Sequence, residues 1–222
     1  SKFVPPLNEV AFSAYARIQD DGTSMASAFL KSVRIIFLAA MPFYLGLAVV
    51  ADPLVAVVLG DKWLATGPVV TLLALAMPFM TLQVLFAPAS DARGHPEISA
   101  RNSATGAVVL GIAFLIGAQW GVRGLGIAWI AAYPLYLAIC ARRTLPVIGV
   151  GTSDVLRAVA VPVLAATAMA AGVWLVDRSL PVLPTLLRLG VLVCCGGAIY
   201  LAVLLTVARD MVRDTVALIR NR

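Results

Sequence analysis

The chain has 222 residues, of which 61% are hydrophobic and only 13% are charged, and its mean hydropathy is +0.97. Soluble domains carry about 25% charged residues, so this composition excludes an ordinary soluble globular protein. The net charge of +6 does not indicate nucleic-acid binding, because membrane proteins gather Lys and Arg in their cytoplasmic loops.

The first segment precedes any long apolar run. Residues 1–22 are predicted to be the end of one helix, which Gly22 stops in a left-handed conformation. Thr23 or Ser24 then offers an N-cap for a second helix. Because the chain begins with Ser1 in the middle of a membrane pattern, we expect it to be a piece of a longer protein.

Most of the remaining chain consists of six runs without a charged side chain. An apolar helix of about 20 residues, rising 1.5 Å per residue, crosses the roughly 30 Å hydrocarbon layer. The predicted fold is therefore all-α: one polytopic membrane domain over 1–222 with about six transmembrane helices, a partial helix before them and an amphipathic tail over 208–222. The uncharged runs are 35–51, 63–90, 102–122, 124–141, 158–176 and 189–208.

The connections between these runs are predicted to be short. The first span is predicted to end at Asp52-Pro53, and 54–59 are predicted to continue as a short interfacial helix. The link at 121–124 is so short that the flanking helices must be antiparallel neighbours. Residues 146–151 are predicted to form a loop, after which Ser153 or Asp154 caps the fifth helix.

The basic residues predict the orientation. Cytoplasmic flanks carry the excess of Lys and Arg. Thirteen of the 17 Lys and Arg residues lie on alternate flanks that include both ends of the chain, so both ends are expected in the cytoplasm. The four on the other side are Lys62, Arg123, Arg178 and Arg188.

No catalytic or cofactor motif is present in the sequence, which predicts a protein that is not an enzyme and needs neither cofactor nor metal. A Gly-rich phosphate loop, a Walker lysine and an H-E-x-x-H motif are all absent. The one histidine, His95, lies in a predicted loop. Three cysteines lie in apolar runs without metal-binding spacing, as is usual for small apolar fillers.

Charged side chains avoid the middles of the spans. A charge at the bilayer centre costs about 2.5–3.5 kcal/mol, and the nearest candidates, Asp52 and Arg188, lie at the edges. Proline and glycine supply the features that can bend these helices. Pro42 with Gly46 in the first span and Pro78 in the second are the candidates for a role in conformational change.

Several short patterns in a fixed order resemble a known family. The chain is similar to the C-terminal half of the Wzx-like polysaccharide and lipopolysaccharide flippases, in the multidrug/oligosaccharidyl-lipid/polysaccharide exporter superfamily. The resemblance runs over nearly the whole chain. It is carried by Pro-Phe-Tyr-Leu-Gly at 42–46, Val-Leu-Gly-Asp-Lys-Trp at 58–63, Asp-Ala-Arg-Gly-His-Pro at 91–96, Arg-Asn at 101–102 and Gly-Val-Arg-Gly-Leu-Gly-Ile-Ala at 121–128.

The resemblance implies a transporter about twice this length, in which two helical lobes surround a central cavity. This piece would hold the end of the eighth helix and helices nine to fourteen. The implied activity is the turning of an undecaprenyl-diphosphate-linked oligosaccharide from the cytoplasmic to the periplasmic leaflet of the bacterial inner membrane. The implied partners are this lipid-linked oligosaccharide, the bilayer, and a polysaccharide polymerase with its export machinery; nucleic acid is not among them.

The resemblance implies that the family's cavities hold diphosphate and sugars with cationic residues, but most of those expected positions lie in the absent half and none lies in mid-span here. Arg93 and Arg101 are two cations on one short predicted loop, and arginine pairs with phosphate through its bidentate fork, so they are candidates for the substrate path at the cytoplasmic mouth. The opposing interpretation is that these two arginines only anchor the topology. A multidrug or cation antiporter of the same superfamily would need a carboxylate within the membrane. A membrane-embedded glycosyl- or acyltransferase would need clustered polar residues, for which 91–101 is the one candidate, and a structural subunit without transport is a further alternative.

We expect Lys62 and Arg143 to lie on opposite sides of the membrane. Single cysteines placed at these positions, in a protein whose three native cysteines are replaced, should react with an impermeant thiol reagent from opposite faces of sealed vesicles. Modification of both positions from the same face would contradict the predicted topology.

Overall fold

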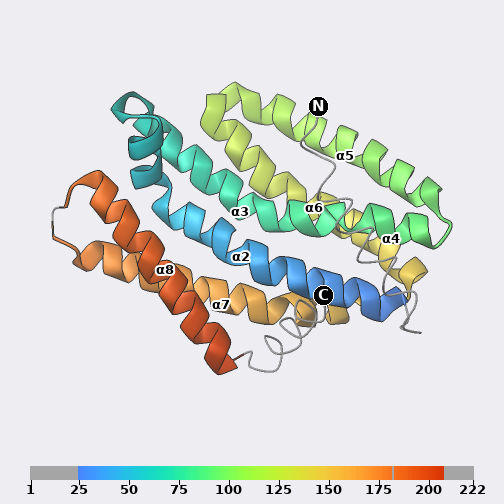
Figure 1. Ribbon diagram of the computed structural model, residues 1–222. Coiled ribbons are helices and arrows are strands. Elements are labelled where there is room, and N and C mark those ends of the chain that lie inside the picture. Colours follow the sequence, from blue (N-terminus) through green and yellow to red (C-terminus); the bar gives the residue numbers. More distant parts are fainter. Residues whose placement is uncertain (1–24, 182, 208–222) are drawn as a thin grey trace. The chain divides into compact units, whose positions relative to one another are not determined.

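The computed structural model describes residues 25–181 and 183–207. The predicted end of a preceding helix over 1–22, its N-cap at Thr23 or Ser24, and the amphipathic tail over 208–222 lie outside the described residues. Every regular element within the described ranges is helical (Figure 1). The elements are α2 (Met25–Val58), η2 (Asp61–Thr66), α3 (Gly67–Val84), α4 (Phe86–Ala92), α5 (Pro96–Gly117), η3 (Ala118–Trp120), α6 (Gly121–Ile148), α7 (Thr152–Ser179) and α8 (Thr185–Val207).

Five segments of the described chain are long and apolar enough to cross a membrane. The third of them, Pro96–Ile148, has 53 residues and folds back on itself as two helices, α5 and α6. The chain reverses at Gly121, whose φ of +67° is a conformation that glycine adopts without steric cost. The prediction of an all-α polytopic membrane bundle with about six long helices is therefore confirmed.

Two predicted boundaries are wrong, and in both the helix continues past a proline. The first span does not end at Asp52-Pro53, because α2 runs through Pro53 as far as Val58, so the residues predicted to continue as a short helix belong to α2 itself. The predicted loop at 146–151 begins late, because α6 contains Pro146 and ends at Ile148, after which Gly149 takes the left-handed conformation typical of a helix C-terminus. Proline is tolerated inside membrane helices because neighbouring groups satisfy the freed backbone.

Two further boundaries differ in detail. The predicted span 63–90 is divided into η2, α3 and α4, with a break at Leu85. At the start of α7 the backbone amide of Gly151 donates to Asp154 Oδ2 at 3.1 Å. Asp154 thus supplies the capping carboxylate from inside the first turn, reaching back as in a capping box, while Ser153 lies within the helix.

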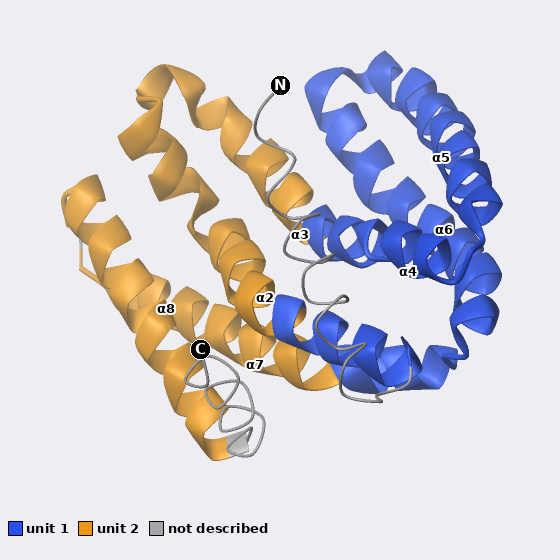
Figure 2. Cartoon of the chain, turned by 45° about the vertical axis from the view of Figure 1, so that its right-hand side comes forward, with its two compact units in different colours: residues 1–36, 76–159 blue, residues 37–75, 160–222 orange. Residues whose placement is uncertain are grey.

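The chain forms two compact units (Figure 2). Of the described residues, unit 1 comprises 25–36 and 76–159, and unit 2 comprises 37–75, 160–181 and 183–207. In unit 1, α5 and α6 pack along each other as an antiparallel hairpin. Phe29 of α2 stacks on Phe86 of α4, with ring centroids 6.0 Å apart, and both side chains are fully buried.

Small residues set the close approach of the α5–α6 hairpin. A Cβ atom added to Gly117 would lie 2.6 Å from the backbone oxygen of Gly124, which is too close for any side chain. Ala128, one turn further along α6, lies against the same face. Without a hydrophobic driving force between helices in lipid, such backbone proximity is a main source of helix association.

Unit 2 brings together α8 with parts of α2, α3 and α7. A Cβ atom added to Gly46 of α2 would be in ordinary contact, 3.6 Å from Met169 Cε of α7. A Cβ atom added to Gly172 of α7 would lie 2.8 Å from Ile199 Cδ1 of α8. Thr71 Oγ1 of α3 donates to the Ala48 carbonyl of α2 at 3.2 Å.

The chain passes from one unit to the other inside α2, α3 and α7. Each of these helices carries a proline near the crossing, at Pro42, Pro78 and Pro162. A proline removes the amide that would bind the carbonyl four residues earlier. Those carbonyls belong to Leu38, Ala74 and Ala158, and each lies next to a boundary residue of the units.

We expect Gly117→Ala to destabilise the protein, because the new methyl group would force the backbones of α5 and α6 apart. Overpacking of this kind costs about 1–3 kcal/mol. Gly111→Ala on the same helix is the matched control, since a Cβ atom there meets nothing within 4 Å. Detergent-induced unfolding of both variants would measure the difference, and equal stability of the two would contradict the packing described here.

Candidate functional site

One end of unit 1 gathers arginine side chains around the last turns of α6. Arg93, just after α4, donates through Nε to the carbonyl oxygen of Val147 at 3.2 Å. This carbonyl belongs to the final turn of α6, where backbone oxygens have no helical partner and attract cations. Arg93, one of the predicted substrate-path residues, therefore contacts the C-terminal end of α6 directly.

Arg143 joins α6 to the beginning of α5. Its Nη1 donates to Thr105 Oγ1 at 2.7 Å, and more weakly to Asn102 Oδ1 and the Arg101 carbonyl, both at 3.4 Å. Because Arg143 and Val147 lie one turn apart on α6, the predicted residues Arg93 and Arg101 both lie beside this last stretch of the helix.

A buried polar pair supports this end of the hairpin from inside. Asn102 Nδ2 donates to Thr144 Oγ1 at 3.2 Å, and Asn102 is 4% exposed while Thr144 is fully buried. Sequence reasoning missed Asn102, Thr144 and Arg143 as members of one cluster. Their spacing carried a signal, since polar residues at 101, 102 and 105 fall on one face of a helix.

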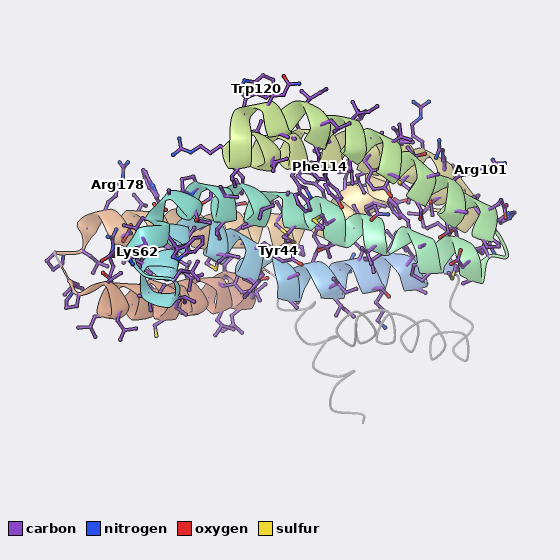
Figure 3. The ribbon with its side chains drawn as sticks, turned by 90° about the horizontal axis from the view of Figure 1, so that it is seen from above. Tyr44, Lys62, Arg101, Phe114, Trp120 and Arg178 are labelled. Atoms are coloured by element: carbon purple, nitrogen blue, oxygen red, sulfur yellow. The ribbon has the colours of Figure 1, made fainter. Side chains whose placement is uncertain are left out.

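Arg101 differs from Arg93 and Arg143 because its guanidinium has no hydrogen-bond partner among the described residues. Its side chain is exposed, and its charge acts on Glu97 one turn earlier. Glu97 itself lies 2.8 Å from His95 Nδ1. Arg101 and Trp120 occupy opposite ends of the hairpin, with Phe114 between them (Figure 3). The Arg101 guanidinium is thus available to an anion at this end.

The interior of unit 1 contains a row of aromatic side chains along α6. The ring centroids of Phe114 on α5 and Trp129 on α6 are 5.2 Å apart. Trp129 stacks nearly parallel to Tyr133, and Tyr133 contacts Tyr136 edge to face. Gln83 Nε2 of α3 donates to the Tyr136 hydroxyl at 3.1 Å. Tyr133 and Tyr136 are buried, so this row is core packing and not an open sugar-binding surface.

The conformational candidates lie in α2 and α3. Pro42 and Pro78 are half-buried and interrupt the backbone hydrogen bonds of their helices. In unit 2 the Tyr200 hydroxyl of α8 donates to the Leu38 carbonyl, the group freed by Pro42, at 2.6 Å. Pro162 is fully buried in α7 and was missed by sequence reasoning, although the same proline signal was present.

An ion pair closes the end of unit 2 where α7 leads into α8. Arg188 Nε and Nη2 donate to the two carboxylate oxygens of Asp177 at 2.6 and 2.8 Å, a bidentate pair. Arg178 covers the Trp174 ring at 3.9 Å from its centre. Arg188 is half-exposed, and it lies at the helix edge, as the sequence predicts for a rim charge.

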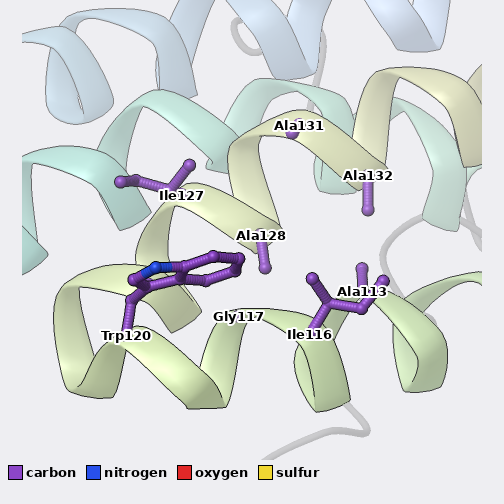
Figure 4. A pocket seen from close by; sticks show the side chains of 9 residues that line it. Ala113, Ile116, Gly117, Trp120, Ile127, Ala128, Ala131 and Ala132 are labelled. Carbon is purple, nitrogen blue, oxygen red and sulfur yellow. The ribbon is translucent and has the colours of Figure 1, made fainter.

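A pocket of about 560 Å³ follows the seam of the α5–α6 hairpin (Figure 4). Its walls are apolar, and no carboxylate, cation or hydroxyl lines it. In the described part of the chain no group of three or more His, Cys, Asp or Glu residues could hold a metal ion. The pocket is lined by Ala113, Ile116, Gly117, Trp120, Gly124, Ile127, Ala128, Ala131 and Ala132.

Comparison with known proteins shows that part of this chain is similar to polysaccharide biosynthesis proteins. Residues 1–68 match the family described as polysaccharide biosynthesis protein. The chain is 27% identical over 134 residues, 59% of its length, to the teichuronic acid biosynthesis protein TuaB of Bacillus subtilis. It is 38% identical over 72 residues, 32% of its length, to the lipopolysaccharide biosynthesis protein WzxC of Escherichia coli.

A third relative is an uncharacterized membrane protein in the cps region of Klebsiella pneumoniae, 37% identical over 76 residues and 34% of this chain. The chain spans only 27%, 16% and 15% of the lengths of TuaB, the Klebsiella protein and WzxC. No solved structure matches it. These findings confirm the resemblance to the Wzx-like polysaccharide and lipopolysaccharide biosynthesis proteins, which the chain shares over part of its length.

Proposed function

We propose that this chain belongs to a membrane transporter that turns a diphosphate-linked oligosaccharide lipid from the cytoplasmic to the outer leaflet of a bacterial inner membrane. The observation that carries the proposal is the similarity to TuaB and WzxC, proteins named for teichuronic acid and lipopolysaccharide biosynthesis, in a chain built of apolar helices. A role as transporter rather than enzyme is part of the proposal.

The basic end of unit 1 supports a cytoplasmic location for the start of α5 and the end of α6. Arg93, Arg101 and Arg143 meet there, whereas Arg123 lies near the turn at the opposite end of the hairpin. The bias of Lys and Arg toward the cytoplasm then puts both ends of the chain inside. A polysaccharide polymerase and export machinery would act on the cargo after it reaches the outer leaflet.

Arg101 is the residue that we propose for the first contact with the cargo. Arginine binds phosphate through two parallel N–H groups, and such charge-assisted hydrogen bonds are stronger than neutral ones. The guanidinium of Arg101 is exposed and makes no hydrogen bond to another described residue. Arg93 instead uses Nε to hold Val147, so we assign Arg93 mainly to positioning α6.

Pro42, Gly46 and Pro78 are proposed to shape the helices that bend during transport. Transporters of this architecture work largely by rocking helical bundles against each other, and bends at proline or glycine can assist. Pro42 and Pro78 support this role because the carbonyls that they free lie where α2 and α3 pass between the compact units. Gly46 lies against Met169 of α7, where an added Cβ atom would make only ordinary contact, so its proposed contribution is the conformational freedom of its backbone.

We expect Arg101→Lys to lower transport roughly ten- to hundredfold, because Lys keeps the charge but loses the second parallel hydrogen bond of the fork, and a hydrogen bond to a charged group is worth about 1.5–3 kcal/mol. The assay follows an undecaprenyl-diphosphate oligosaccharide in proteoliposomes, measured by lectin access to the sugar. Arg123→Lys is the matched control, since Arg123 is exposed at the other end of the same hairpin.

Transport of the cargo by the unaltered protein tests the proposed function itself, and its absence would reject the flippase assignment. If the protein with Lys at both 93 and 101 transports at the unaltered rate, the flippase assignment stands, but specific recognition of diphosphate by these two arginines is rejected.

We expect Pro42→Ala to leave the protein at normal abundance and to slow export. Alanine restores the missing amide and favours a straighter α2. The measurement compares export of the labelled glycolipid with the amount of protein in the membrane. Export at the unaltered rate and abundance would reject a role for Pro42 in conformational change.

A further inference from the structure

The Leu38 carbonyl of α2 has lost its helical partner. In an unbroken helix it would accept the amide of residue 42, but that residue is proline and has no N–H. The Tyr200 hydroxyl of α8 donates to this oxygen at 2.6 Å instead. One side chain from another helix thus supplies the donor that the backbone lacks.

The surroundings make this contact important. Tyr200 is 7% exposed, and Phe37 and Met41, which flank Leu38 on α2, are also buried. In the hydrocarbon layer no water is present to take the place of a lost donor. The Leu38 carbonyl therefore depends on Tyr200 in a way that a carbonyl on a water-exposed helix would not.

A second contact on α2 shows what is special about the first. Thr71 Oγ1 donates to the Ala48 carbonyl at 3.2 Å. The residue four positions after Ala48 is Asp52, which has an amide, so the threonine adds a second donor to a carbonyl that can already be satisfied. Tyr200 replaces a missing donor, whereas Thr71 supplements an existing one.

We propose that Tyr200 is a positioning residue that stands in for the missing amide at Pro42 and so ties the bend of α2 to the position of α8. When α8 lies as described here, the interrupted helix has its carbonyl satisfied. When α8 moves away, α2 must rearrange to find another donor or leave the carbonyl unpaired. The proposal concerns the two helices alone and holds for any cargo.

The first test is a double-mutant cycle of Tyr200→Phe and Pro42→Ala in the purified protein. The ratio of unfolded to folded protein is measured as SDS is titrated into mixed micelles that contain the folded protein. Tyr200→Phe keeps the ring and removes only the donor, so it should raise this ratio roughly three- to tenfold, in the range of hydrogen bonds between membrane helices.

In the Pro42→Ala background the amide of residue 42 is restored and can satisfy Leu38. Tyr200→Phe should then change the ratio by less than about twofold. The same effect of Tyr200→Phe in both backgrounds, or no effect in the unaltered protein, would overturn the proposal, because a packing role for the ring does not depend on residue 42. Thr71→Val is the matched control, and it should change the unfolded-to-folded ratio by the same factor in the unaltered protein and in the Pro42→Ala background.

The second test measures the shape of α2 directly and needs only the Tyr200→Phe variant. Spin labels at Lys31 and Val57, both exposed on α2, bracket Pro42 at a helical separation of about 39 Å. The three native cysteines are first replaced. Tyr200→Phe should shift or broaden the distance distribution between the labels, while Thr71→Val should leave it unchanged. An identical distribution with and without the Tyr200 hydroxyl would overturn the link between α8 and the bend of α2.

Discussion

The structure depends on one constraint: every backbone polar group inside a bilayer must find its partner within the protein. Helices meet this constraint residue by residue, which is why the described chain contains only helical elements. The exceptions occur at prolines, and there other groups must compensate. At Pro42 the compensation comes from Tyr200, a residue 162 positions from Leu38 in the sequence, so a local defect becomes a long-range link.

The same constraint explains where polar side chains are placed. Charges gather at the helix ends, where Arg93 closes the last turn of α6 and Arg188 pairs with Asp177. Asn102 and Thr144, a polar pair buried near a helix end, hydrogen-bond to each other, and Arg143 donates to Asn102. Between these ends, glycine and alanine let helices approach closely, because van der Waals packing replaces the hydrophobic effect as the source of association in lipid.

The sequence was sufficient to predict the helical class, the six long helices and the sharp turn near Gly121, because length, apolarity and glycine act locally. Helix ends were predicted less well, since Pro53 and Pro146 would stop a helix in water but do not stop one here. The arginine cluster was predicted only in part: Arg93 and Arg101 were identified, whereas Arg143 and Asn102 act through contacts 41 residues apart. Tyr200 could not be predicted at all, because nothing near it in the sequence marks Leu38 as its partner.

The α5–α6 hairpin has a consequence for how the protein enters the membrane. The two helices are separated by the three residues of η3, contact each other at Gly117 and Gly124, and are joined at their far ends by Arg143. They therefore suit insertion as a pair, with their contacts formed as they enter the bilayer. In the orientation proposed above, the tip of this hairpin is the part that must cross, and it brings a single charge, Arg123. Insertion then requires one guanidinium to pass through the hydrocarbon layer, at a free-energy cost of about 2.5–3.5 kcal/mol. The arginines at the other end of the hairpin stay on the cytoplasmic side and do not cross.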